Sequence, residues 1–210
     1  PTMVLGSRVA IKTVGYHPTN PVERNVPSVL ASTSLHDTVD GRLLALCDST
    51  FLTALRTGAA SAVVTDVLAI ESASTLGMVG CGAQAVTQIH AISRVRSIER
   101  ILAFDADATV AESLAARLAK AGVTVDIEVV EHPGIAVRDA DVLCTATSVD
   151  PGAGPVFEDV PHHPWLHVNA VGADLPGKFE LPDGLLAEAA EADREAARNF
   201  MDIAIAAGQD

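Results

Sequence analysis

Hydrophobic and polar positions follow two different patterns along the chain, and the change falls near residue 72. Beyond it, short apolar runs alternate with stretches in which apolar residues recur every three or four positions, as is typical of helices. These runs of strand length lie at 76–79, 101–104, 123–129, 141–147 and 166–171. Strands alternating with helices predict an α/β fold with a doubly wound parallel sheet, because parallel neighbours need a crossover connection. We expect this domain to span residues 73–189.

The helices of this domain follow from the same pattern. One begins near Ala85, a second runs from Asp107 to residue 121, and a third begins at Pro133. Residues 182–207 are rich in Ala and Glu and predict a last helix. We therefore expect 190–210 to be a C-terminal helical segment, and no chemistry is assigned to it.

Residues 1–72 predict a separate region, a small antiparallel sheet followed by a helix. The strand candidates are 8–14, 27–33, 33–39 and 42–48. Asp40-Gly41 is a strong signal for a hairpin between the last two. From 49 to 68 apolar residues recur at helical spacing. The whole chain is thus expected to pair a Rossmann-type sheet with part of a smaller α+β domain.

Charge and composition narrow the class of protein. The formal net charge of −13 argues against nucleic acid or an anionic membrane surface as a partner. No apolar run is expected to be long enough to span a bilayer. The three scattered cysteines (Cys47, Cys81 and Cys144) predict free thiols in a reducing cytoplasm. The prolines and irregular spacing around His162, His163 and His167 favour a solvated loop over a metal site.

The candidate chemistry begins with Gly80-Cys81-Gly82-Ala83-Gln84-Ala85. It fits the Gly-x-Gly-x-x-Gly/Ala fingerprint of a dinucleotide-binding turn, set between a strand and a helix. Gly80 permits the tight turn, Gly82 admits a pyrophosphate, and Ala85 allows close helix packing. Asp105 ends the next apolar run, where an acid would bind the adenine ribose hydroxyls and favour NAD over NADP. The alternative is a glycine-rich turn without a ligand.

Other candidates stand at the carboxyl ends of later strands, where the ligands of such sheets bind. Thr147 ends the fourth predicted strand, and Asp174 lies just beyond the fifth. Asp174 is either a turn former or a catalytic carboxylate beside a nicotinamide. Arg56, inside the apolar stretch 49–68, is either an arginine extending to water or the partner of a substrate carboxylate. The sequence favours neither role for Arg56.

Several segments together resemble the ornithine cyclodeaminase and mu-crystallin family. They are KTVGYHPTNP at 12–21, LTALRTGAAS at 52–61, GCGAQA at 80–85 and HVNAVGADLPGK at 167–178. The resemblance covers about residues 8–189, and within the family the first and third segments look most like lysine cyclodeaminases. Family members are over a hundred residues longer, so we expect this chain to be a fragment that lacks parts of the site.

The resemblance implies a homodimer with a tightly bound NAD. Residues 1–72 would be part of the substrate-binding and dimerisation domain, and 73–189 the NAD-binding domain. Asp174 resembles the catalytic acid/base, and Lys12 and Arg56 resemble the residues that hold the substrate carboxylate. The positions that resemble cofactor contacts are Ser28, Gly80, Gly82, Ala83, Gln84, Asp105, Thr147, Val171, Gly172, Ala173 and Lys178.

The implied reaction converts L-lysine to L-pipecolate, or L-ornithine to L-proline, with release of ammonia and internal recycling of the hydride. The sequence does not distinguish the two substrates, because one methylene is a matter of pocket volume. Two other functions remain open. One is an NAD(P)-dependent imine reductase or amino-acid dehydrogenase, and the other is a non-enzymatic binder of the mu-crystallin kind.

Overall fold

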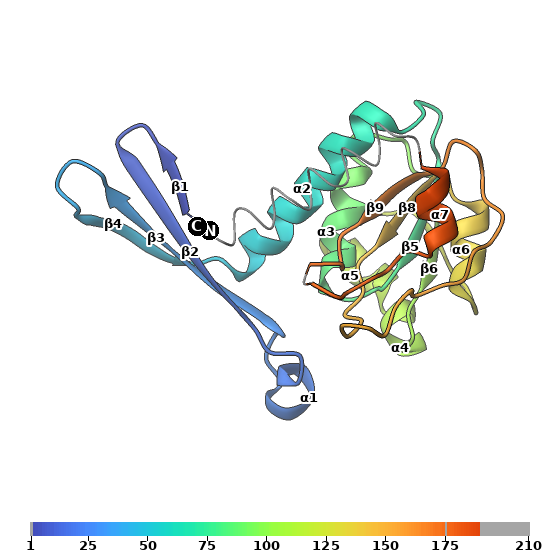
Figure 1. The fold of residues 1–210 in the computed structure, drawn as a ribbon, viewed down its shortest axis with the longest axis horizontal. Helices are drawn as coiled ribbons and strands as arrows, with labels where there is room; N and C mark the ends of the chain where they lie inside the picture. Colours follow the sequence, from blue (N-terminus) through green and yellow to red (C-terminus); the bar gives the residue numbers. More distant parts are fainter. Residues whose placement is uncertain (1, 175, 190–210) are drawn as a thin grey trace. The chain divides into compact units, whose positions relative to one another are not determined.

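A computed structural model describes residues 2–174 and 176–189, which fall into two units with a boundary between Thr53 and Ala54 (Figure 1). The sequence pattern places the boundary near residue 72 instead. The difference arises because residues 54–68 of helix α2 (Thr50–Leu68) belong to the second unit, which α2 contacts through Gly58, Ser61, Ala62 and Thr65. The predicted C-terminal segment 190–210 lies outside the described residues.

The first unit is a four-stranded antiparallel sheet in the order β1-β2-β3-β4. The strands are β1 (Thr2–Leu5), β2 (Arg8–Tyr16), β3 (Val29–Asp37) and β4 (Leu43–Asp48). The predicted hairpin joins β3 to β4, and Gly41 has the positive φ, 76°, that this turn requires. The sequence pattern missed β1 and the short helix α1 (Asn20–Arg24), which occupies the predicted turn region.

The second unit contains a parallel sheet in the order β7-β6-β5-β8-β9, so the predicted α/β fold is confirmed. Its strands are β5 (Thr75–Val79), β6 (Arg100–Phe104), β7 (Asp126–Val129), β8 (Val142–Thr145) and β9 (His167–Ala170). Its helices after α2 are α3 (Ala83–Ile92), α4 (Ala108–Glu112), α5 (Leu114–Lys120), α6 (Pro133–Asp139) and α7 (Asp183–Glu188). The single helix expected from Asp107 to residue 121 is divided at Ser113.

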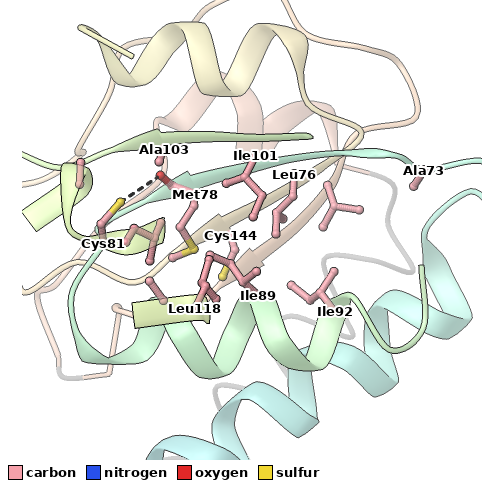
Figure 2. Close-up of a cluster of buried hydrophobic side chains, with 14 of the residues drawn as sticks. Ala73, Leu76, Met78, Cys81, Ile89, Ile92, Ile101, Ala103, Leu118 and Cys144 are labelled. Atoms are coloured by element: carbon pink, nitrogen blue, oxygen red, sulfur yellow. Dashed lines mark hydrogen bonds between the residues drawn. The ribbon is translucent and has the colours of Figure 1, made fainter. Parts of the chain in front are cut away.

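Two apolar clusters bury the two faces of this sheet. On one face Leu76 and Met78 of β5 pack with Ile89 of α3 and Leu118 of α5 (Figure 2). On the other face the next residue of β5, Val79, packs with α6 and Phe157. Because side chains alternate along a strand, the largely apolar central strands β5, β6 and β8 contribute to both faces at once.

Helix α2 contacts α3 through a small residue, and hydrogen bonds from Arg96 hold its C-terminal end. A Cβ on the buried Gly58 would come within 2.7 Å of the Thr87 carbonyl carbon. Near the end of α2, the buried Arg96 donates to the carbonyl oxygens of Asp66, Ala69 and Ile70 at 2.8–3.0 Å. These bonds satisfy carbonyl groups that a helix end leaves without internal partners.

The expectation about membrane-spanning runs needs correction. Helix α2, with 19 residues, is long and apolar enough to cross a bilayer by length and composition, even though Arg56 and Asp66 interrupt its apolar run. A single such helix is weak evidence for a span, because core helices of soluble proteins pass the same test.

Candidate active site

The glycine turn between β5 and α3 has the geometry that the fingerprint predicts. Gly80 has φ 90°, and a Cβ there would lie 2.7 Å from the Ala146 carbonyl oxygen, so no larger residue fits. Gly82 is the N-cap of α3 and faces open space, with no atom within 4 Å of a built Cβ. As a glycine, the N-cap Gly82 has no side chain to cap the first turn of α3. Its N–H groups are therefore available to a phosphate, and the turn fits a dinucleotide.

Asp105 lies at the end of β6 and is bound to the glycine turn. One carboxylate oxygen accepts the Cys81 backbone N–H at 2.7 Å, and the other accepts the Asp107 N–H at 3.0 Å. Each oxygen keeps a lone pair for a further donor. The acid is therefore held beside the turn in an orientation that suits a ribose hydroxyl.

Arg117, on α5, holds the same turn and was not singled out from the sequence. Its guanidinium donates to the carbonyl oxygens of Gly82 at 2.9 Å, Cys81 at 2.5 Å and Val110 at 3.1 Å. An arginine between Leu114 and Leu118 gives no local signal of this role, because the turn lies far away in the sequence. The rigid guanidinium suits such a multiple contact.

The Cys81 thiol inside the turn is expected to be unreactive. Burial, together with the charge of Asp105, raises its pKa to about 12, although Arg117 acts in the opposite direction. The thiol is therefore protonated near neutral pH and is a poor nucleophile. Cys47 and Cys144 are also free, as the sequence predicted.

A buried carboxylate, Glu180, connects the ends of β8 and β9. One of its oxygens accepts the backbone N–H and the hydroxyl of Thr147, at 2.8 and 2.7 Å. The other accepts the Thr145 hydroxyl at 2.8 Å and the Gly172 N–H at 2.7 Å. Sequence reasoning selected Thr147 and Gly172 but missed Glu180, whose partners are distant along the chain.

Asp174 and Lys178 form an ion pair just beyond β9. The Lys178 ammonium lies 3.0 Å from an Asp174 oxygen, and the lysine side chain is 4% exposed whereas the aspartate is 61% exposed. A buried cation therefore holds a carboxylate that remains open to solvent. Because the Gly80 turn packs against residues 146–147, the carboxyl ends of β5 and β8 adjoin at this edge of the sheet.

The remaining selected residues are distributed over both units. Lys12 and Ser28 belong to the first unit, where the Lys12 ammonium donates to the Thr53 hydroxyl at 3.2 Å. Arg56 is exposed on the part of α2 that belongs to the second unit. In that unit, Ala83 and Gln84 open α3, and Val171 and Ala173 flank Gly172. Among residues 2–174 and 176–189, no three His, Cys, Asp or Glu side chains are grouped to hold a metal.

Comparison with known proteins identifies the family. The ornithine cyclodeaminase/mu-crystallin family matches residues 1–204. The chain belongs to this family. It is 46% identical over 189 residues to L-lysine cyclodeaminase of Streptomyces rapamycinicus, an alignment that covers 90% of this chain and 54% of that protein.

Two solved structures of family members resemble the fold closely. A lysine cyclodeaminase, studied for its recognition of L-lysine, L-ornithine and L-2,4-diaminobutyric acid, matches with a TM-score of 0.83 and 48% identity over 88% of this chain and 53% of that one. An archaeal alanine dehydrogenase dimer with bound NAD matches with a TM-score of 0.78 and 34% identity over 89% and 56%. The chain thus spans about half the length of the relatives it matches.

Proposed function

We propose that the protein containing this chain is an NAD-dependent cyclodeaminase that converts L-lysine to L-pipecolate or L-ornithine to L-proline. The observation that carries the proposal is the exposed Asp174 carboxylate, paired with the buried Lys178, at the sheet edge that also bears the glycine turn. The identity with L-lysine cyclodeaminase supports it. Residues 73–189 form the cofactor domain in this proposal, and 1–72 contribute to the substrate domain.

The glycine turn and the strand ends hold the cofactor in this proposal. N–H groups of α3 bind the pyrophosphate, and Asp105 accepts a ribose hydroxyl and repels a 2′-phosphate, which favours NAD over NADP. The other positions proposed to contact the cofactor are Ser28, Thr147, Val171, Gly172, Ala173 and Lys178. When bound there, NAD would supply reversible hydride transfer at the substrate Cα.

Asp174 performs the proton transfers. Its carboxylate accepts a proton from the side-chain amine, so that this amine attacks Cα, and it donates a proton to the α-amine that leaves as ammonia. Lys178 keeps the carboxylate in one orientation through the 3.0 Å ion pair. Lys12 and Arg56 bind the substrate carboxylate and direct the Cα–H bond toward the cofactor, an effect of positioning.

Exposed apolar side chains in the first unit support a homodimer. Large hydrophobic residues are more than half exposed on β1 and β4: Met3, Val4, Leu43 and Leu46. Exposed apolar surface of this kind marks association sites. Covering it with a second copy agrees with the dimer of the related alanine dehydrogenase.

The test uses the complete protein and amino acids deuterated at Cα. We expect lysine or ornithine to give a cyclic product that keeps the deuterium, whereas Asp174→Ala loses on the order of 10²–10⁴ in kcat and still binds NAD. A dehydrogenase, as in the related alanine dehydrogenase, would leave the label on released NADH. A binder would form no product. A cyclic product without the label would refute the recycling of the hydride.

A further inference from the structure

The hydrogen bonds of Glu180 close the chain segment that carries Asp174. The Gly172 N–H binds the Glu180 carboxylate, so the two ends of segment 172–180 are joined. Asp174 and Lys178 lie within this closed segment and pair with each other. The second Glu180 oxygen ties the same point to Thr147 beyond β8. One carboxylate therefore fixes several selected site residues relative to the sheet.

The chemistry of these contacts requires a carboxylate of this length. Glu180 is 1% exposed, and two of its four partners are backbone N–H groups that can only donate. Each carboxylate oxygen accepts one backbone N–H and one hydroxyl. Glutamine would replace one of these oxygens by an NH₂ group, which cannot accept, and one backbone N–H would lose its partner. Aspartate is one methylene shorter and cannot reach both strand ends. Gly172 also packs closely here, because an added Cβ would lie 2.5 Å from the Thr147 carbonyl oxygen and would overlap the Glu180 carboxylate.

We propose that Glu180 is a positioning residue for the reaction at this site. By closing segment 172–180 and binding it to the end of β8, it holds the Asp174 carboxylate and Thr147 at the distance that proton transfer and cofactor binding need. This inference rests on the proposed cyclodeaminase function, in which Asp174 moves the protons.

Asp141 provides a matched control at the opposite end of the same strand. It directly precedes β8, and one carboxylate oxygen accepts the N–H groups of Ser74 and Thr75 at 2.9 and 3.0 Å. The other oxygen accepts the Trp165 indole N–H at 3.0 Å. Asp141 thus ties strand ends together as Glu180 does, but at the amino edge of the parallel sheet, away from the site.

The experiment compares Glu180→Gln with Asp141→Asn in the complete protein. Both variants should lower Tm, but we expect kcat with lysine or ornithine to fall by roughly 10²-fold only in Glu180→Gln, the effect of a misplacement on the order of 1 Å. KM should stay within roughly threefold, since substrate binding at Lys12 and Arg56 is untouched. Amide hydrogen exchange should speed up in Glu180→Gln at Gly172 or Thr147, whichever N–H faces the new NH₂ group, and stay unchanged at both in Asp141→Asn.

The outcomes separate this inference from the proposed function. A wild-type protein that turns over neither amino acid refutes the function alone, and exchange at Gly172 and Thr147 still decides whether Glu180 closes the segment. Unchanged protection at both Gly172 and Thr147, or equal kcat in the two variants, overturns the inference. If Glu180→Gln does not fold, Thr145→Val removes one donor and keeps the shape of the side chain. We then expect kcat to fall by roughly tenfold, and an unchanged kcat overturns the inference.

Discussion

Replacing Gly58 by alanine should destabilise the protein, although alanine is normally the better helix residue. Gly58 is buried in α2 where this helix crosses α3. An added Cβ would lie 2.7 Å from the Thr87 carbonyl carbon and 3.2 Å from the Gln88 nitrogen, and would overlap the Thr87 oxygen. All three are backbone atoms that cannot rotate away. The two helices must therefore separate, and the contacts around them are lost.

The magnitude follows from two opposing effects on the free energy of unfolding. Alanine in place of glycine favours a helix by about 1 kcal/mol. Overpacking costs about 1–3 kcal/mol, and a clash with backbone falls at the upper end. The net loss is then about 2 kcal/mol, which lowers Tm by roughly 4–8 °C for a protein of this size.

Thermal unfolding followed by circular dichroism measures this difference, with Ala59→Gly as the control. Ala59 is the exposed neighbour of Gly58 in the same helix. Helix propensity alone predicts opposite signs for the two variants, a gain for Gly58→Ala and a loss of about 1 kcal/mol for Ala59→Gly. The close contact with α3 predicts that both lose stability. A Tm of Gly58→Ala at or above the wild-type value would refute the reasoning.

Three further predictions concern the cofactor turn, acid stability and the substrate. Arg117→Met removes the charged hydrogen bonds that hold the glycine turn, each worth about 1.5–3 kcal/mol, and should raise the Kd for NAD roughly tenfold in calorimetric titrations. Arg138→Met is the exposed control. Equal Kd values for the two variants would contradict the role of Arg117. Burial alone would raise the pKa of Asp141, but N–H donation by Ser74, Trp165 and Thr75 outweighs it and holds the pKa below 3.8. The stability from Asp141 is thus present above about pH 4 and lost as pH falls through the lowered native pKa. The Tm difference between wild type and Asp141→Asn should shrink in that range, and a difference independent of pH would speak against it. Arg56→Ala should raise KM roughly tenfold by the same hydrogen-bond value; unchanged kinetics would make Arg56 only a surface residue.

The sequence alone was enough to predict the α/β fold and the glycine turn, because both depend on local signals. Apolar runs of strand length and helical periodicity are read within a few residues, and they gave all five strands of the parallel sheet. The Gly80 turn requires a positive φ that glycine adopts without strain, so its position was also readable. Such features depend on neighbours along the chain.

The tertiary structure decided which polar groups meet at the site. The Asp105–Cys81 contact joins residues 24 positions apart, and the Glu180 carboxylate reaches Thr145 over 35 positions. Arg117 binds the glycine turn over a similar separation. Contacts of this range leave no periodic signal, because they depend on strand order in the folded sheet. For the same reason the sequence identified Gly172 and Thr147 as site residues, whereas folding was needed to show that Glu180 joins them.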